Sequence, residues 1–367
     1  MTADALDLLC RLMRSALAAE EGQAVGRVPV PEASVRALLE GVRRHRVPEL
    51  LHSRADDLGL PGGAAEILAA MVEGARQRRM VHALETVRAW QLLDTAGIDA
   101  LVFKGIPLAV LTTGQPGARG AGDIDLLVRP AAAAEAHRLL SASGWALHEQ
   151  CRIEPGMWAW RHVLRWGHTL TYLGPGADVD LHWRLDAMPG AQPDPAALLA
   201  RRTPVEVGGV AVPTLAPADA FRHLAGHREG WIWLRTLVDL RRLARDPDVF
   251  AQELPAPALA SLAAARATVG LPDSVPARVL AAIDRVPDAV VARARASHLL
   301  PVAAWGGAST ARDFRNGLAS TRGPRDLRQL AVGLVLPAHA ALPVRSATAW
   351  GGVPRAFALR AQRLVRR

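Results

Sequence analysis

Lysine is nearly absent from this sequence, since Lys104 is the only one among 44 lysine and arginine residues. Cysteine is also scarce: Cys10 and Cys151 are too few for a disulfide framework or a cysteine zinc site. A membrane helix needs about 20 consecutive apolar residues, and the chain has no apolar run of that length. We also recognise no secretory signal at its start. We therefore expect a cytoplasmic protein with no membrane partner.

Acidic residues are also few relative to basic ones, so the net charge is +9 and the pI is about 11.0. Such an excess of positive charge invites a nucleic-acid partner. The arginines are scattered along the chain, however, and a polyanionic small molecule such as a nucleoside triphosphate fits the charge equally well. The abundance of alanine and arginine predicts more helix than strand.

Hydrophobic spacing divides the chain into three parts. Residues 1–95 and residues 217–367 place apolar side chains at helical spacing, and we predict a helical region for each. Residues 96–216 instead contain short apolar runs between glycines and prolines, which predict strands. The expected fold class is α+β, with a small mixed β-sheet core flanked by mainly helical N- and C-terminal regions.

Asp123 and Asp125 are the residues that point most directly to chemistry. They open a predicted strand over residues 123–128, directly after a glycine-rich loop over residues 114–122. Residues two apart in a strand face the same side, which places the two carboxylates roughly 7 Å apart. Such carboxylates repel each other unless a cation lies between them, and their hard oxygens suit Mg²⁺ or Mn²⁺. The alternative is an edge strand with two solvated aspartates.

A phosphate site is predicted shortly before that loop. Lys104 and Gly105 follow a predicted strand over residues 98–103 and precede a short helix. Backbone N–H groups at such a helix start bind anions, and the lysine adds a positive charge. Arg119, in the glycine-rich loop, is a further candidate phosphate ligand. Alternatively, Lys104 is a solvated residue at the end of a strand.

A second pair of carboxylates, Asp178 and Asp180, lies on another predicted strand over residues 178–185, with His182 on the same face. A third carboxylate from a neighbouring strand would complete a two-metal site or accept a proton from the acceptor substrate. The sequence does not decide which of the two aspartates has this role. His182 either faces the acceptor or is a hydrogen-bonded structural histidine.

His223 and His227 are four residues apart on a predicted helix, as in a metal-binding pair. The glutamate of the metalloprotease motif does not follow His223, so we favour a packing or acceptor-pocket role. We assign Asp239 to the same helix and the same possible pocket. The competing interpretation of Asp239 is a salt bridge to Arg235, four residues earlier.

Together these motifs resemble the uncharacterised bacterial nucleotidyltransferase family, which belongs to the polymerase-beta-like superfamily. Members often occur in natural-product biosynthetic clusters, including those of lasso peptides. The motifs that carry the resemblance are Phe103–Gly105, Gly122–Val128 and Asp180–Trp183, within a similar stretch of roughly residues 30–245. The resemblance implies a small mixed sheet flanked by helices and the transfer of a nucleoside monophosphate from a nucleoside triphosphate.

The resemblance also implies roles for individual residues. By motif match, Asp123, Asp125 and Asp180 would be the catalytic metal ligands. Lys104 and Gly105 would lie near the phosphates of the nucleotide. One departure from the wider superfamily is that its usual Gly-Ser pair is replaced here by Lys104-Gly105, with a longer gap to the aspartates.

Three functions fit these observations. The leading one is a magnesium-dependent nucleotidyltransferase that modifies a hydroxyl or phosphate of a small-molecule or peptide acceptor by two-metal in-line displacement. In the second, the acceptor is RNA, as in nucleotidyltransferase toxins, and RNA binding should then depend steeply on salt. The third is a non-catalytic module that binds a nucleotide or a partner protein, for which magnesium would be dispensable.

Overall fold

The computed structural model describes residues 1–120, 122–148, 151, 153–186, 193–300, 323–336 and 353–365. The first part of the chain is helical, as predicted from its apolar spacing. Its helices are α1 (Ala3–Glu20), α2 (Val35–His45), α3 (Pro48–His52), α4 (Ala55–Leu58), α5 (Gly62–Gly74) and α6 (Arg76–Thr95). Within the described ranges, each helix is too short or too polar to span a bilayer.

A five-stranded sheet forms the centre of the molecule. Its strands and the helices between them are β1 (Ala100–Phe103), α7 (Gly105–Thr113), β2 (Asp123–Val128), α8 (Ala133–Ala142), β3 (Ala146–Leu147), α9 (Trp158–Trp166), β4 (Thr169–Leu173) and β5 (Asp178–His182). The strand order is β1-β2-β5-β4-β3, in which β2 and β5 are parallel and the other neighbours are antiparallel. The sheet is therefore mixed, as expected.

Alternation along the strands gives the sheet two different faces. One face buries Val102, Ile124 and Val179 in a core that also contains apolar residues of α6, α8 and α9. The opposite face carries Asp123 and Asp125 at the start of β2. Further along this face of β2, Leu127 is buried in the core of the helical regions. The acidic residues thus lie at the N-terminal ends of two inner strands of a well-packed sheet.

The remainder of the chain is again mainly helical. It comprises α10 (Pro195–Ala200), the separate hairpin of β6 (Thr203–Val207) and β7 (Val210–Thr214), then α11 (Pro217–Gly226), α12 (Leu234–Leu243), α13 (Ala256–Thr268), α14 (Ala277–Ile283), α15 (Asp288–Leu299), α17 (Pro324–Val335) and α19 (Val353–Val365). The α+β class with helical flanks is confirmed.

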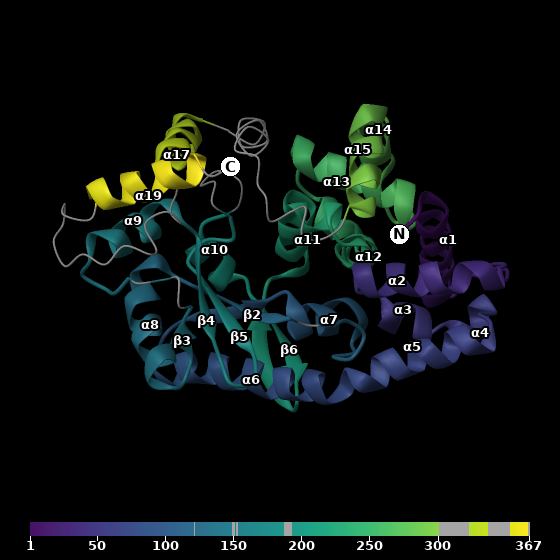
Figure 1. Ribbon diagram of the computed structural model, residues 1–367, viewed down its shortest axis with the longest axis horizontal. Helices are drawn as coiled ribbons and strands as arrows, with labels where there is room; N and C mark the ends of the chain where they lie inside the picture. Colours follow the sequence, from purple (N-terminus) through teal and green to yellow (C-terminus); the bar gives the residue numbers. More distant parts are fainter. Residues whose placement is uncertain are drawn as a thin grey trace.

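Helices α1 to α5 and α11 to α15 lie on the face of the sheet opposite to α6 and touch each other (Figure 1). In the view of Figure 1, α6 runs below the sheet, α1 to α5 lie at the right, and α11 to α15 lie above the sheet to the left of α1. One continuous apolar cluster contains buried residues of α1, α2, α11, α12 and α13 together with Phe103 and Leu127 of the sheet. The helical regions therefore share a core with the sheet and with each other.

Ion pairs among five charged side chains connect the end of α1 to α12 and the residues directly after it. Glu20 accepts hydrogen bonds from Arg242 at 2.6 and 3.1 Å and from Arg245 at 3.1 Å. Glu21 accepts from Arg241 at 2.9 and 3.1 Å and from Arg245 at 3.2 Å. Burial acts to raise the pKa of Glu20, but the hydrogen bonds and charges of Arg242 and Arg245 outweigh it and hold the pKa below the ordinary 4.5. The ionised carboxylate therefore stabilises the fold.

This network predicts how stability changes with acid. Because the folded pKa of Glu20 is lowered, its contribution is present above its unfolded pKa and is lost as the pH falls through the folded value. Glu20→Gln should therefore lower the free energy of unfolding at neutral pH and flatten its decline in acid, as measured by urea unfolding across pH. Glu32→Gln, at an exposed position, is the matched control. Parallel acid curves for Glu20→Gln and wild type would contradict this prediction.

Candidate functional site

The acidic residues predicted from the sequence come together where β2 and β5 run side by side at the centre of Figure 1. The parallel register pairs Asp123 with Asp178 and Asp125 with Asp180. All four therefore start on the same face of the sheet, in two adjacent rows. Asp123 is exposed at the beginning of β2, whereas Asp125 is 3% exposed.

Asp125 is held by two neighbours. Its Oδ1 accepts a hydrogen bond from Nε2 of His182 at 3.2 Å and lies 3.6 Å from Nζ of Lys104. Burial, followed by the charge of Lys104, lowers the pKa of His182 to about 4, so the imidazole is neutral at physiological pH. A carboxylate only accepts hydrogen bonds, so Nε2 of His182 carries the proton. His182 is thus hydrogen-bonded to Asp125, and its possible role at the acceptor stays a prediction.

Asp180 and Asp178 have different surroundings. The hydroxyl of Thr171 donates to Oδ1 of Asp180 at 2.5 Å and fixes that carboxylate beside Asp125. Burial raises the pKa of Asp180, and the nearby Asp125 adds to the rise, while Thr171 and His182 oppose it. Asp178 instead accepts from the backbone N–H of Gly174 at 3.2 Å and closes the β4–β5 hairpin.

The donor set fits a divalent cation. Asp125, Asp180 and His182 each offer one ligand atom, and these atoms lie within 4.8 Å of one another. Two carboxylates supply the hard oxygens that Mg²⁺ and Mn²⁺ prefer, and an imidazole nitrogen is also a common metal ligand. Asp123 lies outside this group of three, two residues before Asp125 at the exposed start of β2.

The predicted phosphate site lies beside the acidic residues. Lys104 caps the N-terminus of α7 with a backbone φ of 64° and ψ of −158°, a conformation that residues with a side chain rarely adopt. Gly105 follows with a φ of 50°. A Cβ at Gly105 would stand 3.7 Å from the carbonyl oxygen of Asp123. The start of α7 is therefore packed closely against the start of β2.

His82 is a residue of the site that the sequence reasoning missed. It projects from α6, and its Nε2 donates to the backbone carbonyl of Asp123 at 3.1 Å. Burial lowers its pKa, although the hydrogen bond to Asp123 opposes this. The contact holds the first residue of β2 in place. A lone histidine in a helix gives no sequence signal for such a role, because its partner lies 41 residues away.

A comparison with known protein families matches residues 31–271 to the family described as uncharacterised nucleotidyltransferase. This match covers more than half of the chain and includes every residue of the acidic site. The chain belongs to this nucleotidyltransferase family. No curated protein matches the chain. Nucleotidyltransferases use a nucleoside triphosphate as substrate, and the acidic group of three described above is suited to the divalent metal that such enzymes usually need.

In this nucleotidyltransferase, the glycine-rich loop is held by α12. Nε of Arg119 donates to Oδ2 of Asp239 at 2.6 Å, and both side chains are almost completely buried. Nη1 of Arg235 donates to the carbonyl oxygen of Gly120 at 2.8 Å. In the described part of the chain, Asp239 thus pairs with Arg119 and not with Arg235. The pair fixes the loop that leads into Asp123.

The predicted helix containing His223, His227 and Asp239 was wrong in part. Helix α11 ends at Gly226, His227 has an extended backbone, and Asp239 belongs to the separate helix α12. A 3₁₀ segment over residues 228–231 lies between the helices. Glycine is a poor helix former, which accounts for the end of α11 at this position.

The histidines nevertheless gather near the acidic site. The ring of His223 packs edge-on against Phe103 at 5.3 Å, and the ring of His227 lies 5.2 Å from that of His223. His168, which the sequence reasoning did not select, lies 5.8 Å from His182. Burial lowers the pKa of His168 to about 3 and lowers that of His223 well below its usual range. The rings of His168 and His223 therefore favour the neutral form, and both lie near the charge of Lys104.

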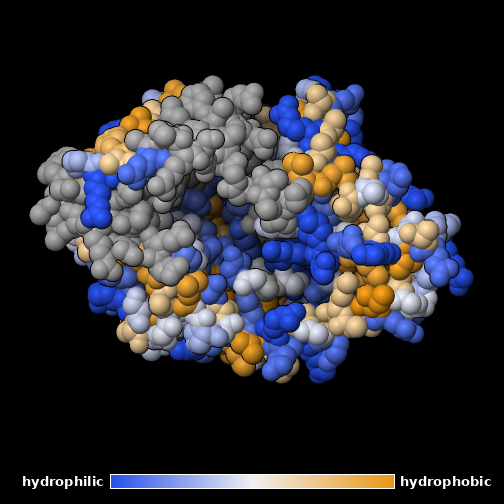
Figure 2. All heavy atoms as spheres, in the orientation of Figure 1, coloured by the Kyte–Doolittle hydropathy of each residue, from blue (hydrophilic) through white to orange (hydrophobic). Residues whose placement is uncertain are grey.

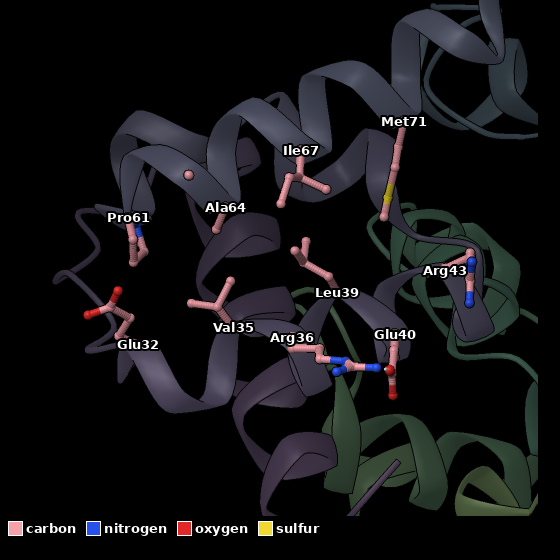
Figure 3. Close-up of a pocket in the computed structure, with 11 residues that line it drawn as sticks. Glu32, Val35, Arg36, Leu39, Glu40, Arg43, Pro61, Ala64, Ile67 and Met71 are labelled. Atoms are coloured by element: carbon pink, nitrogen blue, oxygen red, sulfur yellow. Dashed lines mark ion pairs between the residues drawn. The ribbon is translucent and has the colours of Figure 1, made fainter.

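The surface supports this position for the site. Figure 2 shows a hollow lined mainly by hydrophilic residues at the middle of the molecule, between the sheet and the C-terminal helices. A different cavity of about 720 Å³ lies between α2 and α5, where Val35, Leu39, Ile67 and Met71 project toward one another (Figure 3). Its walls are mainly aliphatic and include none of the acidic residues on β2 and β5, so we assign it no part in the chemistry.

Proposed function

We propose that the protein transfers a nucleoside monophosphate from a nucleoside triphosphate to a hydroxyl or phosphate group of a small-molecule or peptide acceptor, in a magnesium-dependent reaction. The observation that carries this proposal is the in-register pair of Asp125 and Asp180 on adjacent parallel strands, beside Lys104 at the start of α7. Family membership supplies the reaction class.

Asp125 and Asp180 would hold the divalent cation, with Asp123 contributing from the exposed start of β2. When bound, the cation supplies positive charge that neutralises the triphosphate and polarises its α-phosphate. His182 keeps the Asp125 carboxylate oriented through its Nε2–H, and Thr171 does the same for Asp180. Such outer partners fix the direction of ligand oxygens.

The triphosphate would lie over the start of α7. In the first turn of α7, Gly105 and Ile106 carry backbone N–H groups, whereas Pro107 has none, and such first-turn donors suit an anion. The lysine ammonium adds a point charge. We assign Arg119 to holding the glycine-rich loop, because Asp239 already accepts a hydrogen bond from its Nε.

In the reaction, an oxygen of the acceptor attacks the α-phosphorus in line with the leaving group. A new P–O bond forms as the bond between the α-phosphorus and the bridging oxygen breaks, and pyrophosphate leaves. We place the acceptor on the side of α11, where His182 and His223 pack against Phe103 and His227 lies beside His223. The lowered pKa values of His182 and His223 favour neutral imidazoles there, which suit a polar, uncharged part of the acceptor.

Calorimetric titration with ATP, CTP, GTP and UTP, each with and without Mg²⁺, tests this proposal. We expect one or more nucleotides to bind wild type in a magnesium-dependent manner and to lose that dependence in Asp125→Ala. Equal binding with and without Mg²⁺ would contradict the proposal and would favour a nucleotide-binding module without catalysis. RNA binding that weakens steeply as the salt concentration rises would instead favour the RNA-directed enzyme.

A further inference from the structure

Lys104 is unusual in three respects. It is the only lysine in a chain with 44 lysine and arginine residues. Its side chain is only 12% exposed, and its Nζ lies 3.6 Å from Oδ1 of Asp125 and 5.8 Å from the ring centre of Phe103. Its backbone occupies a region in which glycine is the usual residue. Burying a charge and straining the backbone both cost free energy of folding, which suggests that this one lysine has a specific task.

The backbone conformation is the first indication of that task. A φ of 64° with a ψ of −158° strains a residue that carries a Cβ, and such strain persists only where the surrounding structure enforces it. Glycine at this position would turn the chain from β1 into α7 without that strain. The side chain of Lys104 is therefore retained against a backbone preference.

The choice of lysine is the second indication. Elsewhere the chain pairs its carboxylates with arginine, as at Arg119–Asp239 and Arg242–Glu20. A guanidinium is broad and planar, whereas an ammonium is a compact point charge on a flexible stem. The ammonium of Lys104 therefore resembles a small cation in size and charge, and its stem permits it to move away. It touches the same Asp125 that belongs to the three-residue cation group.

We propose that Lys104 is a tethered counter-ion, which balances the acidic site before a divalent cation binds and leaves Asp125 for the triphosphate when the cation arrives. This inference rests on the proposed function, since it assumes that Asp125 and Asp180 hold a metal. With the ammonium in place, the buried carboxylate of Asp125 and the half-buried carboxylate of Asp180 are partly neutralised, and the fold tolerates their proximity. A cation must compete with this ammonium and is repelled by it.

The proposal predicts opposite effects on stability and on metal affinity. Removing the ammonium leaves the carboxylates of Asp125 and Asp180 repelling each other, so the metal-free protein loses thermal stability. The same change removes both a competitor and a positive charge a few ångströms from the cation. We therefore expect Lys104→Met to bind Mn²⁺ at least about tenfold more tightly than wild type, because a tenfold change corresponds to a small fraction of a close charge–charge interaction.

The experiment uses the full chain and Mn²⁺ alone, without nucleotide, followed by the free-ion electron paramagnetic resonance signal and by calorimetry. Thermal unfolding with and without Mn²⁺ gives the second readout, and the rise in Tm should be larger in Lys104→Met than in wild type. Arg129→Met is the matched control. It removes one positive charge just past the other end of β2, where Arg129 pairs with the exposed Asp99. Its Mn²⁺ affinity should equal that of wild type.

Lys104→Gly makes the same comparison without backbone strain, so it serves if Lys104→Met does not fold. Equal Mn²⁺ affinity in wild type and in the lysine variants would overturn the counter-ion proposal and leave the proposed function intact. An equal gain in Arg129→Met would also overturn it, because the effect would then be one of net charge. Absence of Mn²⁺ binding in every variant would overturn both this inference and the metal site on which it rests.

Discussion

Asp180→Asn should lower turnover by more than about 100-fold, since loss of outer partners of a metal ligand alone costs about 10–100-fold. Asp178→Asn, two residues earlier on the same strand, should leave turnover within a factor of about three, as do most changes away from a site. The two residues differ in their partners. Thr171 fixes Asp180 beside Asp125, whereas the Asp178 carboxylate is used by the backbone of the β4–β5 hairpin.

Pyrophosphate release with the nucleotide that binds most tightly is the measurement for this pair of variants. Urea unfolding of each variant shows whether its fold is kept. This check matters most for Asp178→Asn, because the Asp178 side chain accepts a hydrogen bond from the backbone of the β4–β5 hairpin. A larger loss of turnover in Asp178→Asn than in Asp180→Asn, at unchanged stability, would assign the third carboxylate to Asp178. Large losses in both variants would show that both carboxylates are needed and would contradict the prediction.

Asp239→Leu should destabilise the fold by about 3–5 kcal/mol, because it leaves the guanidinium of Arg119 buried without its carboxylate. The double variant Arg119→Met/Asp239→Leu should recover most of this loss, since replacing both partners of a buried ion pair by apolar residues is often neutral. The recovery is the distinctive part of the prediction. It separates the cost of an unpaired buried charge from the cost of a changed helix surface.

Urea unfolding of wild type, both single variants and the double variant completes a thermodynamic cycle for the pair. Additive losses, with the double variant less stable than either single variant, would show that the two side chains act independently and would contradict the assignment. Turnover of the stable double variant then tests the loop. If the ion pair positions the glycine-rich loop, turnover should fall even where stability has returned.

The sequence was sufficient to locate the local elements of the core. The strand predicted over residues 123–128 is β2 with the same bounds, because alternation and the glycine-rich loop before it mark both its faces and its start. Hairpins with clear turn glycines, such as β6–β7 at Gly208 and Gly209, were also predictable. These features depend on neighbouring residues alone, which a single sequence contains.

Contacts between distant residues were not predictable in this way. The parallel pairing of β2 with β5 determines which aspartates become neighbours, yet nothing local to either strand specifies it. The Arg119–Asp239 pair joins residues 120 positions apart, so the sequence offered for Asp239 only a possible acceptor pocket or a local salt bridge with Arg235. The break after Gly226 was missed because the apolar spacing continues through it.

The packing of α1 has a consequence for synthesis of the chain. Helices α2 and α3 cover part of α1 as soon as they form, but another part lies against α13, where Arg14 bonds the carbonyl of Thr268, 254 residues later. At about 5–20 residues per second, the ribosome needs roughly 13–50 s to deliver that partner. During this interval the nascent N-terminus exposes leucines that the finished protein buries, which makes α1 a natural early substrate for a chaperone.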